Sequence, residues 1–212
     1  MLGMTADPIH SHRFTIEDYL RLESDAVEKH EYRNGEIVAM AGGSPQHSLI
    51  IANLIRETGN RLKGKPCRVY DSNLRVRVSP TGLYTYPDLL VICGEPQFDP
   101  RDTRRTTVIN PRTIVEVLSP STEAYDRGDK FRQYLRIDSL REYVLVSQAR
   151  PFVESFYLQA DGTWLFAPVS GLETAAKLRS LDVDLPLAEA YVGIEFPPEP
   201  ELTPDADGMT RI

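Results

Sequence analysis

Two acidic residues interrupt the most apolar stretches of this chain, and they are the residues best suited to carry chemistry. Asp88 lies in PDLLVIC (87–93) and Glu116 in TIVEVLS (113–119). Neither stretch alternates apolar with polar residues, so each is predicted to be a strand buried on both faces. One buried carboxylate favours an ion pair with an arginine, but two on neighbouring strands repel each other. The pair therefore favours a metal site.

Three further residues can reach the same place from other elements. Glu31 precedes Asn34-Gly35, the strongest short signal for a hairpin. His47 lies in the first turn of a predicted helix, where a neutral imidazole can meet a phosphate or water. Lys130 lies in the helix predicted over 122–136, from which it can lean over the end of the Glu116 strand. A local packing or capping role for His47 and a surface position for Lys130 are the alternatives.

Capping, turn and periodicity signals predict the elements that hold these residues. Thr15 and Asp18 fit a capping box that opens a short helix through Leu22. Ser44-Pro45 opens a second helix, which ends at Lys63-Gly64. Alternation over 68–78 predicts a half-exposed strand, and the loop over 94–112 is long enough to be functional or mobile. Strands joined by tight turns are predicted over REYVLVS and PFVESFYLQADGTWLFAPV.

Length and composition predict one globular domain. The chain has 212 residues, 41% hydrophobic and 26% charged, which excludes collagen-like, coiled-coil and wholly disordered proteins. We expect a flexible leader over 1–12, a domain over 13–196 and a disordered acidic, proline-rich tail over 197–212. No apolar run is long enough to span a membrane and no signal peptide is evident, so we expect a cytoplasmic protein without a membrane partner. Cys67 and Cys93 are predicted to be buried thiols.

The net charge of −7 is unevenly distributed. From Asp182 onward there are eight acidic residues and one arginine, so this segment carries the whole net charge and residues 1–181 are neutral. The segment 56–77 holds seven Lys and Arg against two acids, a surplus that can follow a phosphate backbone. A solvated basic face is the alternative interpretation of the same segment.

The ordered succession of short motifs resembles the restriction endonuclease-like family, which is common in cyanobacteria and other bacteria. The motifs are Glu31-Tyr32-x-x-Gly35-Glu36-Ile37, Ser44-Pro45-x-His47, Tyr86-Pro87-Asp88, Val115 to Thr122, Asp126-Arg127-x-x-Lys130-x-x-x-Tyr134 and Glu142-Tyr143. The resemblance covers roughly residues 13–195, and the order of the motifs is more specific than any one of them. It places the chain in the PD-(D/E)xK nuclease superfamily. It implies a mixed α/β fold, with a central mixed β-sheet flanked by helices.

This resemblance also implies roles for individual residues. Asp88 is the aspartate of the PD motif and Glu116 the acid of the (D/E)xK motif, and both ligate a divalent cation together with the Val117 carbonyl. Glu31 is the acid from the N-terminal element. Oxygen ligands suit magnesium or manganese, which assist phosphodiester hydrolysis. Leu118 stands where the superfamily has its lysine, and Lys130 from the following helix fills that role in the family.

Three hypotheses about function follow. The first is a metal-dependent endonuclease acting on DNA, with Glu31, Asp88, Glu116 and Lys130 at the site and His47 as a helper. A homodimer would suit it, because cutting both strands of a duplex favours two related sites. The second is a non-catalytic module on the same fold that binds metal or nucleic acid. The third is a hydrolase of another phosphoester, because fold does not fix substrate.

Overall fold

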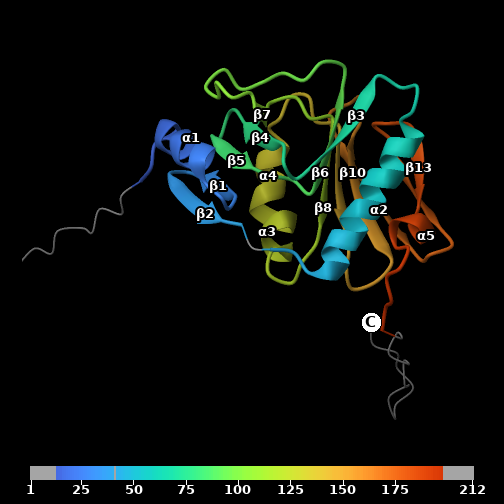
Figure 1. The fold of residues 1–212 in the computed structure, drawn as a ribbon. Coiled ribbons are helices and arrows are strands. Elements are labelled where there is room, and N and C mark those ends of the chain that lie inside the picture. Colours follow the sequence, from blue (N-terminus) through green and yellow to red (C-terminus); the bar gives the residue numbers. More distant parts are fainter. Residues whose placement is uncertain (1–12, 41, 198–212) are drawn as a thin grey trace, which may run out of the picture.

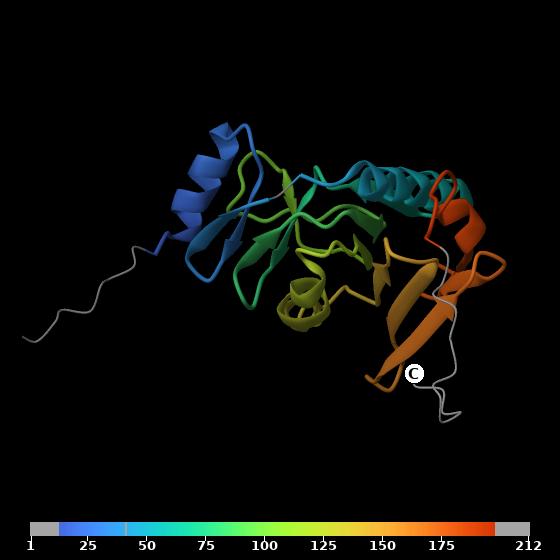
Figure 2. The same ribbon diagram turned by 90° about the horizontal axis from the view of Figure 1, so that it is seen from below.

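The computed structural model describes residues 13–40 and 42–197 of the chain. Two mixed sheets and a small hairpin form the body, with helices on both sides of the larger sheet (Figures 1 and 2). This arrangement confirms the α/β fold class expected from the sequence. The predicted leader over 1–12 lies outside the described residues, as does the predicted tail apart from Pro197.

The larger sheet forms the centre of the fold and has the strand order β11-β10-β9-β8-β6-β3. In that order its strands are Trp164–Ser170, Phe152–Leu158, Glu142–Val146, Thr113–Val117, Leu89–Cys93 and Cys67–Asp71. Strands β8 and β9 are parallel, and the other neighbours are antiparallel. Every residue of β8 is buried, and so are the first four residues of β6. The prediction of two strands buried on both faces is therefore confirmed.

A second sheet stands beside the first and has the order β2-β1-β5-β4-β7. Its strands are Glu36–Ala39, His30–Arg33, Leu83–Thr85, Arg75–Val78 and Thr107–Val108. The predicted hairpin is confirmed as β1–β2, in which Asn34 and Gly35 have φ of 49° and 93°. Both angles lie in the left-handed region that a tight hairpin turn requires. The separate hairpin consists of β12, Ala175–Leu178, and β13, Val183–Pro186.

The helices are α1, Ile16–Asp25; α2, Pro45–Arg61; α3, Glu123–Tyr125; α4, Phe131–Tyr134; and α5, Leu187–Ala190, with a π-helical turn over Asp126–Lys130 between α3 and α4. Helix α2 and the α3–α4 segment cover opposite faces of the larger sheet, whereas α1 packs against the smaller one (Figures 1 and 2). Val115 and Val117 of β8 pack in the same core cluster as residues of α2. Ile114 and Leu118 pack on the other face with Tyr134 of α4. Strand alternation therefore turns Glu116 toward the α3–α4 segment.

The predicted strand over 68–78 is wrong, because the chain turns in the middle of it. Asp71 ends β3, and its carboxylate accepts a hydrogen bond from the backbone N–H of Asn73. The chain then enters β4 at Arg75 and thereby passes from the larger sheet to the smaller one. The alternating pattern runs through both strands and conceals this Asx-type turn.

The prediction of two free thiols is also wrong. Cys67 and Cys93 form a disulfide that joins β3 to its neighbour β6, where the two residues are direct register partners. They stand 26 residues apart in the sequence. Only the antiparallel pairing of these two strands brings them opposite each other, and the spacing alone does not indicate that pairing.

Buried ion pairs anchor the long loop over 94–112. Asp99 is 1% exposed and accepts hydrogen bonds from Arg77 at 2.7 Å and from the Tyr84 hydroxyl at 2.5 Å. Asp102 lies 3.3 Å from the buried guanidinium of Arg75. These two arginines belong to the basic segment over 56–77, so part of its surplus charge is used inside the fold.

Replacing Asp99 tests this anchor. We expect Asp99→Ala to lower the free energy of unfolding by about 3 to 5 kcal/mol, because Arg77 would remain buried without its partner. Asp138→Ala, at an exposed position, is the control and should change it by less than about 0.5 kcal/mol. Urea denaturation followed by circular dichroism measures both. Equal effects of the two substitutions would show that the loop is held by other interactions.

Candidate active site

One pocket of about 480 Å³ collects every residue singled out from the sequence. The hairpin β1–β2, the start of α2, the ends of β6 and β8, and the α3–α4 segment contribute to its walls. The six residues are Glu31, His47, Asp88, Glu116, Val117 and Lys130. Residues far apart in the sequence therefore converge on one hollow of the surface.

The two acids that interrupt apolar stretches are neighbours in space. The Oδ2 atom of Asp88 accepts a hydrogen bond of 2.8 Å from the backbone N–H of Val117. In return, the backbone N–H of Asp88 lies 3.4 Å from Oε2 of Glu116. The Oδ1 atom of Asp88 has no hydrogen-bond partner within the described residues, so it is available to a ligand.

His47 closes this group from the side of α2. Ser44 caps the helix by accepting a hydrogen bond from the backbone N–H of His47, which fixes this residue in the first turn. The imidazole Nε2 then lies 3.1 Å from the Val117 carbonyl oxygen and 3.3 Å from Oδ2 of Asp88. A Cβ atom at Gly43 would lie 2.7 Å from Nδ1 of the same ring, so any other residue there would have to displace the ring.

Lys130 is the central cation of the pocket. Its ammonium lies 2.8 Å from Oε1 of Glu116, 3.2 Å from Oδ1 of Asp126 and 3.7 Å from Oε1 of Glu31. The π-helical turn holds Asp126 and Lys130 at its two ends and thereby presents both to the pocket. Such turns are rare in proteins, and those that do occur are often found at functional sites.

Glu31 is held firmly by groups of the protein. Its Oε2 atom is bound by Arg33, and its Oε1 atom accepts a hydrogen bond from the Thr85 hydroxyl. Burial favours its neutral form, but Lys130, Thr85 and Arg33 together lower the pKa of Glu31 below its usual value. Both oxygens have protein partners, so participation of Glu31 in metal coordination stays a prediction.

Two buried residues of this site belong to a motif found in the sequence but have no role predicted from it. Asp126 is 3% exposed and lines the pocket, and Tyr134 donates a hydrogen bond of 2.9 Å from its hydroxyl to Oε1 of Glu116. Their spacing of four residues on either side of Lys130 was a usable signal, since residues i and i+4 lie on one face of a helix. Neither was given a role, because an acid and a tyrosine in a helix are common on protein surfaces.

Proton affinities in the pocket reflect its excess of acids. Burial raises the pKa of Glu116 to about 8; Lys130 opposes this shift, while Asp126 and Asp88 add to it. Burial lowers the pKa of Lys130, but Glu116, Glu31 and Asp126 outweigh burial and hold this pKa well above its usual value. The hydrogen bond to Asp88 raises the pKa of His47 against the effect of burial.

The donor set fits a divalent cation in chemistry and in charge. Nowhere in the described chain do three His, Cys, Asp or Glu side chains converge as a ready metal cluster. The candidate ligands are instead two carboxylates, of Asp88 and Glu116, and the carbonyl of Val117, all hard oxygen donors that magnesium and manganese prefer. The pocket as a whole is lined by four carboxylates and by the cations of Lys130 and Arg33. When all four carboxylates are ionised, two negative charges remain unbalanced, which one divalent ion would offset.

Comparison with known families agrees with the motifs in this pocket. The model of the Uma2 family, described as "Putative restriction endonuclease", matches residues 16–190. The chain belongs to this family. The match spans the whole of the pocket, including the π-helical turn.

Two relatives and a solved structure resemble the chain over most of its length. An uncharacterized protein of Synechocystis sp. is 40% identical over 185 residues, which are 87% of this chain and 94% of the relative. A second uncharacterized protein of that organism is 35% identical over 157 residues, which are 74% of this chain and 88% of that relative. A crystal structure of a "putative nuclease belonging to DUF820" from Anabaena variabilis has a TM-score of 0.68 at 17% identity, covering 84% of this chain and 98% of that one. This last likeness shows a shared fold.

The length and hydropathy of the described helices show whether any of them could cross a membrane. Not one of those within 13–40 and 42–197 has both the length and the apolar character that a membrane crossing requires.

The raised pKa of Glu116 predicts how stability varies with pH in the metal-free protein. The folded state binds one proton more than the unfolded state between the ordinary carboxyl pKa and about 8. The free energy of unfolding should therefore fall as pH rises from about 5 to about 8. Glu116→Gln removes the titration and should flatten the profile. Denaturation of both proteins in EDTA across this range tests it, and parallel profiles would contradict it.

Proposed function

We propose that this protein hydrolyses phosphodiester bonds in nucleic acid, specifically in DNA, with the help of a divalent cation. The observation that carries the proposal is the convergence of Asp88, Glu116, the Val117 carbonyl and Lys130 in one pocket. Membership of a nuclease-like family supports it. We further propose a homodimer for duplex substrates, because two related sites can address two strands.

Asp88, Glu116 and Val117 would hold the cation, magnesium or manganese. A bound ion of this kind polarises a phosphate oxygen and lowers the pKa of a bound water. The carboxylate of Asp88 is oriented by the backbone N–H of Val117, and Glu116 by the Tyr134 hydroxyl. These hydrogen bonds fix the donors before a ligand arrives, which lowers the cost of ordering them.

Lys130 takes the part of the lysine that is absent at position 118. Leu118 is 4% exposed and packs in the apolar cluster on the Glu116 face of β8. The ammonium of Lys130 reaches the same face from the π-helical turn, 2.8 Å from Glu116. There it can hold an attacking water and offset the charge that develops on the phosphate. His47 can donate a hydrogen bond to a phosphate oxygen next to Asp88.

The decisive experiment separates this proposal from a binding module and from a hydrolase of small phosphoesters. Purified protein is incubated with plasmid, linear and single-stranded DNA, with RNA and with bis(p-nitrophenyl) phosphate, in magnesium, manganese or EDTA. Metal-dependent cleavage of DNA that EDTA abolishes supports the proposal. Binding of DNA without cleavage favours the module, and turnover of the small diester alone favours another phosphoesterase.

Substitution of Lys130 should abolish most cleavage. Lys130→Met keeps the length of the side chain but removes the charge, so we expect a loss of about 100- to 1000-fold in kcat. Arg127→Ala is the matched control, because Arg127 pairs with Glu123 and Glu154 and does not line the pocket. Rates are measured on plasmid DNA. Wild-type activity of Lys130→Met would exclude this residue from the reaction.

Divalent cations should stabilise the fold through Asp88 and Glu116. At a hundred times the dissociation constant, binding adds about 2.7 kcal/mol to the free energy of unfolding. Melting curves of wild-type protein should therefore shift upward in magnesium or manganese, and those of Asp88→Asn should not. A melting temperature of the wild type that ignores both metals would count against the metal site.

A further inference from the structure

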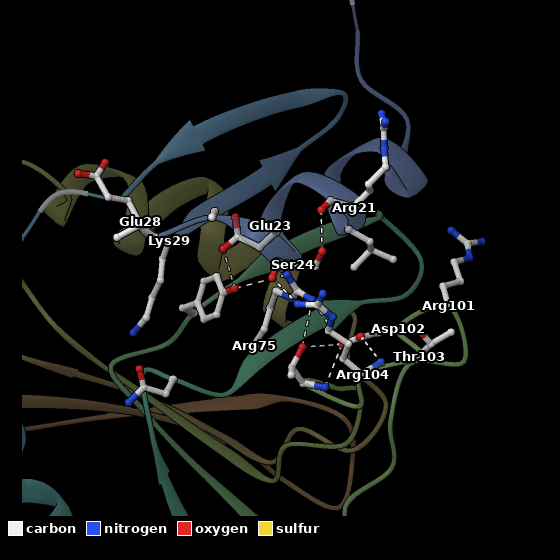
Figure 3. Close-up of a pocket in the computed structure, with 16 residues that line it drawn as sticks. Arg21, Glu23, Ser24, Glu28, Lys29, Arg75, Arg101, Asp102, Thr103 and Arg104 are labelled. Carbon is white, nitrogen blue, oxygen red and sulfur yellow. Dashed lines mark hydrogen bonds and ion pairs between the residues drawn. The ribbon is translucent and has the colours of Figure 1, made fainter.

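Three hollows of the surface adjoin one another, and the candidate active site is the middle one. The α1 hollow, of about 440 Å³, lies between α1 and the loop over 94–112 and shares Tyr86 with the active-site pocket (Figure 3). The α4 hollow, of about 610 Å³, lies beside α4 and shares Arg33 and Tyr125 with that pocket. The shared residues place the three hollows next to one another in a series.

Strand β1 runs along this series. Met40 donates a backbone hydrogen bond to Lys29, which extends the β1–β2 ladder by one residue. Alternate residues of a strand share a face, so Lys29, Glu31 and Arg33 point the same way. Lys29 lines the α1 hollow, Glu31 the active-site pocket, and Arg33 both that pocket and the α4 hollow. From Lys29 to Arg33 the strand advances by about 13 Å.

The charges along the series alternate in sign. Basic side chains outnumber acids in the α1 hollow, whose basic residues are Arg21, Lys29, Arg75, Arg101 and Arg104. Basic side chains also outnumber acids in the α4 hollow, whose basic residues are Arg33, Arg132 and Arg136. The pocket between them has the opposite balance. This pattern complements a polyanion whose central phosphate meets a cation and whose neighbouring phosphates meet arginines.

Each outer hollow contains an exposed arginine that is free to bind. Arg75 is buried against Asp102 and acts inside the fold, whereas Arg101 extends away from this pair (Figure 3). Arg101 in the α1 hollow and Arg136 in the α4 hollow form no ion pair with any described residue. Their guanidinium groups therefore need not break an existing ion pair to take up a phosphate.

We propose that a single polynucleotide strand lies along β1 through all three hollows, with Arg101 and Arg136 binding phosphates on opposite sides of the scissile bond. The inference rests on the proposed function and deepens it, because it specifies a polymeric substrate cut at an internal bond. A small phosphoester would occupy only the middle pocket and would leave both outer hollows unused.

Paired substitutions test the path. Arg101→Ala with Arg136→Ala removes one arginine from each outer hollow, and Arg68→Ala with Arg179→Ala removes two exposed arginines outside the series. Binding of a fluorescein-labelled single-stranded DNA is followed by anisotropy in EDTA at several salt concentrations. We expect the first pair to reduce the slope of log K against log salt by about 1.4, because each arginine that binds a phosphate of a single strand adds about 0.7 to it. The control pair should leave the slope unchanged.

The outcomes separate this inference from the proposed function. Metal-dependent cutting of circular single-stranded DNA, which has no ends, together with a reduced slope for the Arg101 and Arg136 pair alone, supports the path. Two results would overturn the path and leave the nuclease function standing, provided that the wild type cuts DNA. One is an equal slope for both pairs of substitutions, and the other is a reduced slope for the Arg68 and Arg179 pair alone. Turnover of bis(p-nitrophenyl) phosphate without binding or cutting of DNA overturns the polymeric substrate. Inactivity toward every substrate overturns both.

Discussion

The site depends on a buried ammonium surrounded by carboxylates. Lys130 is 5% exposed, and Glu116, Asp126 and Glu31 are each 3% exposed. Burying such charges costs several kcal/mol apiece unless they compensate one another. The carboxylates come from β1, β8 and the π-helical turn, so their attraction to one lysine also joins both sheets to the helical segment. The chemistry of the pocket and the packing of the fold thus rest on the same interaction.

Hydrogen bonds of Gln148 hold together the two elements beside this charged cluster. Gln148 donates to the Leu118 carbonyl at 2.6 Å and accepts from the Ser44 hydroxyl at 3.1 Å. Its backbone carbonyl also accepts from the side chain of Gln46 at 2.9 Å. The start of α2 and the end of β8 are therefore tied together through one residue. That link holds His47 and Val117 at a fixed separation, as a preorganised site requires.

Much of the fold and of the site was predictable from the sequence because local signals there agree. The capping box at Thr15, the Asn34-Gly35 turn and the two apolar strands each have one dominant interpretation, and all are confirmed. The break at Asn73 and the disulfide of Cys67 were missed for a different reason. Both depend on which strands pair with one another, and strand pairing is set by interactions between residues distant in the sequence.

The same distinction applies within the pocket. Asp88 and Glu116 were conspicuous because acids are rare in apolar strands, and the motif order led to Lys130. Asp126 and Tyr134 stand in the same motif as Lys130, but a helix accepts either residue type on its exposed face, so the motif does not predict their burial. Their burial follows only from the docking of the α3–α4 segment against β8. Side chains of ordinary type join the pocket through tertiary packing that a single sequence does not display.

The separation of Glu116 from Lys130 along the chain has a consequence for synthesis. In a motif carried on one strand, acid and lysine would leave the ribosome almost together. In this protein Glu31 and Glu116 emerge earlier, whereas the lysine reaches its place only when the segment after β8 has wound through its π-helical turn and docked. A partly made chain therefore holds carboxylates without their cation. The charged group is therefore complete only once the segment after β8 has docked against the sheet.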